Sequence, residues 1–342
     1  MSRFSLPRYP IIQAPMAGGI TTVDLVTAVA NAGAVGSFGF AYSTADVIAS
    51  DLAQCRAGTD GALLANFFVV EEPAEPSQAD REAACAALEA LAFKGGVYSQ
   101  PQPPYVMDLT AQLAPIWKQP PTYLTFHFGV PSQDIMARAH ALGIAVGISA
   151  TNVSEAKEIA AAGADFIIAQ GIEAGGHRGT FEAAPLSDEA LSTQALTSAL
   201  AKNTSLPIVA AGGIMTASHI KEALAAGAVA VQMGTAFLAA DEAGTAPSYR
   251  EALCEVPCRA TALTTHFSGR VARSLQNEFI TRMAGQPYLP FPIQNRMTGH
   301  CGAPQQSQAQ PNIKVCGREL ALLTFRKGQP LRFWQSFALN YN

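Results

Sequence analysis

The chain has 342 residues, more than twice the length of a typical single domain, so we expect two domains or one large barrel or wound sheet. Only 14% of the residues are charged and 49% are apolar, which indicates a large buried interior and argues against disorder. The net charge is −4, so partners such as nucleic acid or an anionic membrane surface are not expected.

The first ten residues lack the apolar core of a secretory signal, and residues 223–240, although uncharged, contain two glycines and a glutamine. We therefore interpret that stretch as a helix end, a turn and a buried strand rather than a membrane span. The six cysteines are scattered without CxxC spacing, which predicts free thiols in a reducing, cytoplasmic location rather than a structural metal site.

Short apolar or β-branched runs recur along the chain, and each is followed by a stretch of helical character. We predict eight strands, at Ile11–Ala14, Ala34–Phe38, Ala62–Phe68, Tyr123–Phe128, Ile144–Ser149, Phe166–Gln170, Pro207–Ala211 and Ala230–Gly234. Most spacings between them fit one strand, one helix and two short loops. Because the strands are apolar on both faces, eight such units favour an α/β fold, a closed (β/α)8 TIM barrel, over an open wound sheet.

A short repeated motif supports this interpretation. Ala-Gly-Ala at residues 32–34, 162–164 and 226–228 ends a predicted helix and opens a strand each time. Glycine at that position suits the left-handed end of a helix, so the motif predicts a repeated helix-to-strand connection.

Residues 71–121 do not fit the repeat, because they carry eight prolines around one helical run, Gln78–Ala92. We predict an inserted arm after the third strand, which covers the barrel mouth or contacts a second subunit in a homodimer.

The pattern changes again after Thr245. Helical stretches are predicted at Pro247–Cys254, Val271–Met283 and Arg318–Phe325, between Pro-, Gln- and Gly-rich stretches. The domain prediction is therefore a barrel over residues 1–245 and an added helical segment over 246–342 that includes the closing helix of the barrel.

Active sites of such barrels lie at the carboxyl ends of the strands, where this sequence gathers amides and glycines. Asn66 and Gln170 end otherwise apolar strands, and their amides suit a heterocycle with alternating N–H and C=O groups, such as a flavin ring. Gln13 and Gln232 are similar, or pair instead with backbone inside the barrel.

Two glycine-rich turns are candidate phosphate sites. Gly212-Gly213 precedes a helical stretch, and Gly234-Thr235 follows the next strand. Backbone N–H groups at these turns would bind an anion in the place where barrels commonly bind phosphate, although tight turns alone would also explain the glycines.

His177 lies in a glycine-flanked loop, between Gly176 and Arg178-Gly179, where its imidazole could take a proton from carbon next to an electron-withdrawing group. His127, at a strand end between aromatic residues, is either a wall residue or a second site residue. The only carboxylate expected at the mouth is Glu173, so metal-assisted chemistry and paired-carboxylate hydrolysis are not expected.

The segments 10–19, 171–179, 210–214 and 232–235 read PIIQAPMAGG, GIEAGGHRG, AAGGI and QMGT. In this order they resemble the motifs of the FMN-dependent nitronate monooxygenases, formerly called 2-nitropropane dioxygenases. The resemblance covers about residues 8–245 and fades after about residue 290.

The resemblance implies FMN as the cofactor and a set of cofactor-binding residues: Ala14, Pro15, Met16, Asn66, Gln170, Gly175, Gly176, Gly212, Gly213, Gln232, Met233, Gly234 and Thr235. It places His177 at the position of the catalytic base and His127 at that of a second active-site histidine. Tyr105 lies where some members have a substrate-side tyrosine.

The resemblance also implies the reaction, oxidation of alkyl nitronates by O2 to a carbonyl compound and nitrite, with His177 deprotonating neutral nitroalkanes. One alternative is an NAD(P)H-dependent FMN reductase of quinones or enoyl thioesters on the same barrel, since nicotinamide can stack on a flavin without a GxGxxG motif. A second alternative is a flavin-free barrel that binds a phosphorylated ligand.

Overall fold

The computed structural model describes residues 3–91, 100–183, 188–254 and 260–299. At its centre are eight parallel strands: β1 (Ile11–Gln13), β2 (Gly36–Gly39), β3 (Leu63–Phe68), β4 (Tyr123–His127), β5 (Ala145–Ala150), β6 (Phe166–Gln170), β8 (Ile208–Ala211) and β9 (Ala230–Met233). Each of them overlaps one of the eight predicted strands, so the strand predictions are confirmed.

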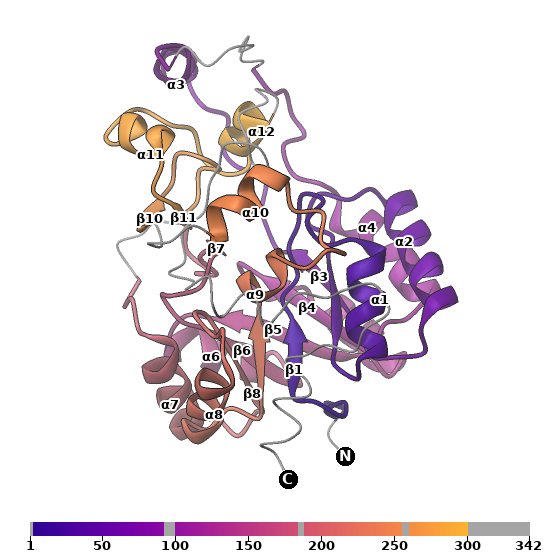
Figure 1. Ribbon diagram of the computed structural model, residues 1–342. Coiled ribbons are helices and arrows are strands. Elements are labelled where there is room, and N and C mark those ends of the chain that lie inside the picture. The colour runs from indigo at the N-terminus through magenta and orange to yellow at the C-terminus, as the bar shows by residue number, and fades with distance from the viewer. Residues whose placement is uncertain (1–2, 92–99, 184–187, 255–259, 300–342) are drawn as a thin grey trace.

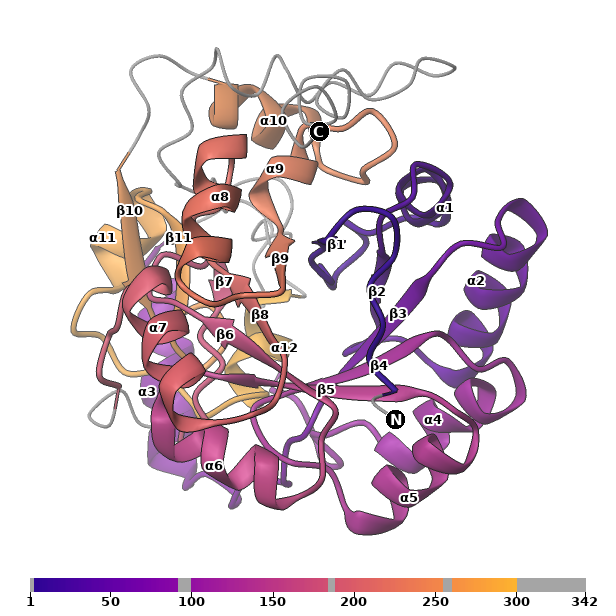
Figure 2. The ribbon, with the colours of Figure 1, turned by 90° about the horizontal axis from the view of Figure 1, so that it is seen from below.

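The eight strands form a closed barrel. They are paired in the order β1-β9-β8-β6-β5-β4-β3-β2, and every neighbouring pair is parallel. The two ends of the sheet meet where Gln13 N donates to Val35 O and Val35 N donates to Ile11 O, at 3.0 Å each. The predicted TIM barrel is therefore confirmed, and Figure 2 shows helices around the strands.

The outer layer consists of α1 (Val23–Asn31), α2 (Ala45–Gly58), α4 (Leu109–Lys118), α5 (Gln133–Ala141), α6 (Val153–Ala161), α7 (Thr193–Asn203), α8 (Ala217–Ala225) and the short α9 (Thr235–Leu238). Side chains next to the helices cap them, as where Thr22 accepts a hydrogen bond from Leu25 N. Gly33, Gly163 and Gly227 of the repeated motif have φ of 89°, 85° and 108°, which confirms the predicted left-handed helix ends.

The inserted arm is shorter than predicted. Its helix α3 (Gln78–Glu89) matches the predicted helical run Gln78–Ala92 up to Glu89, residues 90 and 91 form a turn, and residue 92 lies outside the described residues. However, α4 packs against α2 in the ring of helices and belongs to the barrel, so the arm ends near residue 108 rather than 121. The prolines concealed α4, since Pro115 lies inside it.

The helix predicted over residues 271–283 is wrong in its first half. Strand β11 (Ala272–Leu275) pairs antiparallel with β10 (Thr261–Thr264) and with the two-residue strand β7 (Gly176–His177), and only α11 (Glu278–Met283) is helical. Pairing between segments far apart in the sequence overrides the local helical pattern here. The segment after residue 245 is thus a mixture of strands and helices.

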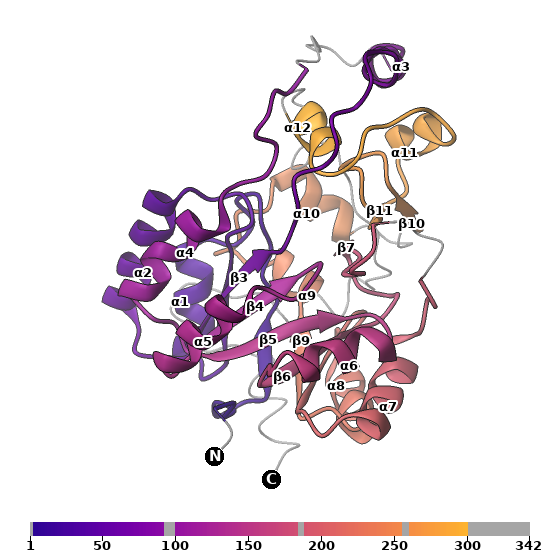
Figure 3. The same ribbon diagram turned by 180° about the vertical axis from the view of Figure 1, so that it is seen from behind.

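Residues 71–91, 100–108 and 260–299 form a second layer, which we call the cap. Helices α3, α11 and α12 (Ile293–Gly299) lie beyond the carboxyl ends of the barrel strands (Figures 1 and 3). They enclose a separate apolar core of Ala84, Leu88, Leu91, Tyr105, Phe279, Met283, Leu289, Ile293 and Met297. The arm therefore shares a core with residues 260–299 beyond the carboxyl ends of the barrel strands.

The remaining expectations concern local features. Helix α10 (Pro247–Cys254) forms where it was predicted, whereas the predicted closing helix at 318–325 lies outside the described residues. No helix in the described part of the chain is both long and apolar enough for a membrane span. Cys55 and Cys85 are free thiols.

Candidate active site

A cavity of about 360 Å³ opens at the carboxyl ends of the barrel strands, below the cap. Its wall contains every residue predicted to bind a cofactor: Ala14, Pro15, Met16, Asn66, Gln170, Gly175, Gly176, Gly212, Gly213, Gln232, Met233, Gly234 and Thr235. His127 and His177 also line it. The structure thus brings together residues from six of the barrel strands and the turns that follow them.

Tyr105 is the predicted site residue that the cavity wall does not include. It is buried in the core of the cap, where its hydroxyl donates to Glu75 at 2.9 Å and accepts from Arg81. Its backbone N–H also donates to Glu72. These contacts hold the arm together, so the structure gives Tyr105 a place in the cap rather than beside a substrate.

The side chain of Gln170 fixes the loop that carries His177. Its Nε2 donates to His177 O at 3.0 Å, and its Oε1 accepts from Gly179 N at 2.7 Å. The same loop is tied to the cap, because His177 is paired with Ala272 of β11. Gln170 therefore uses its amide on the loop backbone, although it lines the cavity as predicted.

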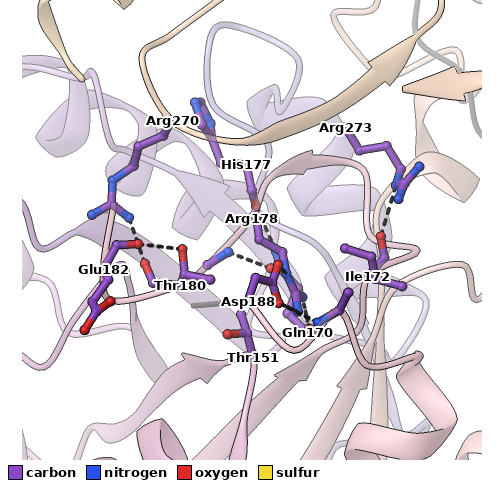
Figure 4. A network of polar contacts seen from close by, with 12 residues as sticks. Thr151, Gln170, Ile172, His177, Arg178, Thr180, Glu182, Asp188, Arg270 and Arg273 are labelled. Carbon is purple, nitrogen blue, oxygen red and sulfur yellow. Dashed lines mark hydrogen bonds and ion pairs between the residues drawn. The ribbon is translucent and has the colours of Figure 1, made fainter. Parts of the chain in front are cut away.

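Arg178, the neighbour of His177, has a supporting role (Figure 4). Its guanidinium forms two hydrogen bonds of 2.7 and 2.8 Å with the carboxylate of Asp188 and also donates to Gln170 O. The bonds from Arg178 hold the pKa of Asp188 below its usual range. This ion pair closes the base of the loop and leaves His177 directed at the cavity.

His177 lies in an aromatic pocket. Its ring centroid is 5.9 Å from that of Phe68, 5.8 Å from Phe128 and 5.7 Å from Phe291. Its Nε2 lies 2.8 Å from the hydroxyl oxygen of Ser268. Burial, with the nearby charge of Arg270, lowers the pKa of His177 to about 4, so the imidazole is neutral at pH 7 and keeps a lone pair.

His127 supports the same loop from the end of β4. Its Nε2 lies 3.3 Å from His177 O, and its ring lies against Phe128, with centroids 4.7 Å apart. A Cβ at Gly179 would lie only 2.6 Å from His127 Cε1, so glycine is required there. Burial lowers the pKa of His127 to about 3. These contacts give it a place in the wall of the cavity, next to His177.

The side-chain amides of Gln13, Asn66 and Gln232 differ in which of their hydrogen-bonding atoms have a partner in the protein. Gln13 lies inside the barrel, where it bonds the backbone of Ala14 and Ser37. Asn66 uses its Nδ2 on Thr125, while the Oε1 of Gln232 is buried on the cavity wall without a hydrogen-bond partner. An unpaired buried acceptor is costly, so Gln232 has the character of a ligand-facing group.

The glycine turn after β8 packs closely on the loop after β6, since a Cβ at Gly212 would lie 2.7 Å from Thr193 Oγ1 and one at Gly213 would lie 3.0 Å from Glu173 Cβ. Gly212 and Gly213 have φ of 120° and 65°, which side-chain-bearing residues rarely adopt. The carboxylate of Glu173, expected at the mouth, instead accepts from both the N–H and the hydroxyl of Thr193 and braces its loop. Within the described residues, no aspartate or glutamate lines the cavity.

Sequence reasoning missed the residues that the cap contributes. Ser268, Arg273 and Phe267 line the cavity, Phe291 contacts His177, and Arg270 lies behind the wall. They lie 90 or more residues beyond His177 in a segment without a local motif. The one usable signal was the Phe291–Asn295 segment, which resembles the family's tail.

The cavity fits a flat, amide-rich ring with an anionic tail. The unpaired Oε1 of Gln232 can accept from a donor on a ligand, and Gly212 and Gly213, which line the cavity, present backbone without side chains to it. Together, fold and cavity define a (β/α)8-barrel enzyme with a neutral histidine at the mouth.

Comparisons with known proteins identify the family. The family model for nitronate monooxygenase matches residues 3–314. A nitronate monooxygenase of Paraburkholderia phytofirmans is 43% identical over 83% of this chain and 77% of its own, and one of Pseudomonas aeruginosa is 40% identical over 83% and 81%. The chain belongs to the nitronate monooxygenase family, whose members are flavoproteins.

Solved structures agree with this assignment. A nitroalkane oxidase from Streptomyces ansochromogenes superposes with a TM-score of 0.85 at 33% identity, over 98% of this chain and 96% of that one. FabK from Thermotoga maritima has a TM-score of 0.68 at 22% identity, over 98% and 94%, and shares the fold.

Proposed function

We propose that this protein oxidises alkyl nitronates with O2 to a carbonyl compound and nitrite, using FMN bound in the barrel cavity. Two nitronate anions and one O2 give two carbonyl compounds and two nitrite ions, which balances atoms and charge. The observation that supports this most directly is His177, neutral and enclosed by three phenylalanine rings at the cavity mouth of a family member.

In this proposal the turns Ala14–Met16 and Gly175–Gly176, which line the cavity, would help to hold FMN. Gln232 and Asn66 offer it hydrogen bonds, and Gly212–Gly213 with Gly234–Thr235 hold its phosphate through main-chain N–H groups. When bound, FMN supplies the electron-transfer chemistry that no side chain can provide.

His177 handles the proton. Because Nε2 is bonded to Ser268, Nδ1 is the ring nitrogen left for a substrate. Nδ1 takes the proton from the α-carbon of a neutral nitroalkane and holds it on the imidazole, whereas a preformed nitronate needs no such step. Phe68, Phe128 and Phe291 keep water away from the ring.

The test starts with the absorption spectrum of the purified protein. We expect a yellow protein that releases FMN on denaturation, consumes O2 with ethylnitronate and forms nitrite and acetaldehyde in equal amounts. Rapid anaerobic bleaching by NADH or NADPH without nitrite formation would instead identify the reductase. A colourless protein that takes up no FMN would leave only a phosphate-binding barrel.

A further inference from the structure

Arg270 is a buried cation without a carboxylate partner among the described residues. It is 9% exposed, and its guanidinium donates to Thr180 O at 2.8 Å and to Phe181 O at 3.2 Å. The other two deeply buried arginines, Arg178 and Arg81, form salt bridges with Asp188 and Glu75. A buried charge is normally paired, so the exception at Arg270 calls for an anion elsewhere.

The position of Arg270 indicates where that anion binds. Its guanidinium carbon lies 4.1 Å from the centre of the Phe128 ring, and that ring centre is 5.8 Å from the centre of the His177 ring. Both groups contact the Phe128 ring, so the positive charge is within about 10 Å of the imidazole. Figure 4 shows Arg270 and His177 on the same side of the loop.

Among the described residues, Arg270 is the deeply buried arginine near His177 that forms no salt bridge. On the loop after β6, Arg178 is neutralised by Asp188, and on β11 the charge of Arg273 is opposed by Glu173. From β4 comes His127, which is neutral at pH 7 because burial lowers its pKa. From α6, Glu155 acts on Arg270 at longer range, but its carboxylate already accepts from Phe181 and Thr151.

We propose that Arg270 is a positioning residue whose fixed charge, acting across Phe128, attracts the nitronate anion to His177 and favours ionisation of a bound nitroalkane. This inference rests on the proposed function. The same charge opposes protonation of His177, so the base stays free while the substrate becomes the anion. A neutral pocket of the same shape would bind nitroalkane and nitronate about equally.

The experiment compares Arg270→Gln, which keeps donors for the two carbonyls but removes the charge, with Arg270→Lys, which keeps the charge. For Arg270→Gln we expect the KM of ethylnitronate to rise about tenfold or more, from a charge about 10 Å away in a poorly solvated site. The KM of neutral nitroethane stays within about twofold, and Arg270→Lys recovers most of the nitronate affinity. Lys202→Gln, at an exposed position in the last turn of α7, is the matched control and leaves both unchanged.

A second readout does not depend on turnover. NMR titration of the His177 imidazole measures its pKa directly, and we expect Arg270→Gln to raise that pKa by about one unit, a tenfold change in proton affinity. Glu155→Gln, which removes the distant negative charge, moves both the pKa and the nitronate KM in the opposite direction, and it serves if Arg270→Gln fails to fold.

The outcomes separate the two proposals. If Arg270→Gln and Arg270→Lys raised the KM of ethylnitronate equally and left the pKa of His177 unchanged, the role of Arg270 would be purely structural. That result would overturn the inference. Parallel rises in KM for the neutral and the anionic substrate would do the same. A shifted His177 pKa in a protein that never oxidises nitronates would uphold the charge effect and reject the proposed function.

Discussion

The barrel and the cap are held together by different kinds of contact. In the barrel the contacts are local in sequence. Most strands pair with the previous or the next barrel strand along the chain, and a helix such as α1 is capped by the residue that precedes it. In the cap, segments far apart in the sequence meet: His177 bonds Ser268, 91 residues later, and Arg282 donates to the carbonyl of Ala90, 192 residues earlier. The barrel provides the cavity, and His177 is held by both parts, by Phe68 and Phe128 of the barrel and by Ser268 and Phe291 of the cap.

His177 therefore lies at the joint between the barrel and the cap, by which we mean the loop from Gln170 to His177. The loop after β6 starts as part of the barrel, at Gln170, and ends as strand β7 of the cap sheet. The position of His177 therefore depends on the packing of both the large apolar core of the barrel and the small apolar core of the cap. Changes at the joint, in the barrel and in the cap should have separable effects on rate and on stability.

The largest effect is expected at the joint itself. His177→Asn removes the base but keeps a polar side chain, so kcat/KM for neutral nitroethane should fall by about 10²–10⁴-fold. Preformed ethylnitronate, which needs no deprotonation, should lose at most about tenfold. Nitrite formation with both substrates checks this, and equal losses would leave His177 with positioning alone.

In the barrel, Phe126→Ala should destabilise the whole molecule. Phe126 is fully buried in the main core, between the sheet and the helices, so its deletion should lower the free energy of unfolding by about 3–5 kcal/mol. Urea denaturation followed by far-UV circular dichroism measures it. A loss below about 1 kcal/mol would mean that the barrel core relaxes around the gap.

In the cap, Met283→Ala should affect activity more than global stability. Met283 is fully buried in the small core that holds Phe279, which stacks on Phe267 at 4.4 Å, next to Ser268. The local cost is at the lower end of about 2–5 kcal/mol, and the cap loosens before the barrel unfolds. We expect a smaller shift of the urea midpoint than for Phe126→Ala but a several-fold lower kcat/KM. If kcat/KM fell only in proportion to the shift of the urea midpoint, the separate roles of barrel and cap would be contradicted.

The same division explains what the sequence could predict. The eight strands, the helix ends and the glycine turns follow from local signals such as the Ala-Gly-Ala motif, and the placing of Gln232 or His177 at strand ends follows from the fold. Ser268 and Arg270 carry no local signal, since they acquire their roles through pairing of β11 with β7. Tyr105 shows the converse, since its correspondence to a substrate-side tyrosine of some family members does not bring it to the wall of the cavity.

The smallest predicted effect is a pH dependence of stability that originates at the joint. Burial lowers the pKa of His177 to about 4 and that of His127 to about 3, whereas both titrate near 6.5 when the chain is unfolded. Between about pH 6.5 and 5 the unfolded chain therefore binds protons that the folded protein does not, so stability falls as the pH falls. Each histidine contributes at most about 1.4 kcal/mol per pH unit, and nothing above about pH 7.5.

Urea denaturation at several pH values between 5 and 8 measures this slope, and the His177→Asn variant isolates the share of His177. We expect the variant to lose between about a third and a half of the slope, because His127 and His266, whose pKa values burial also lowers, supply the rest. The lower limit of pH 5 keeps the carboxylates ionised, among them Asp188, whose pKa the Arg178 ion pair lowers further. A slope that His177→Asn leaves unchanged would show that the imidazole is hydrated in the folded protein, and the cap would then not exclude water from the site.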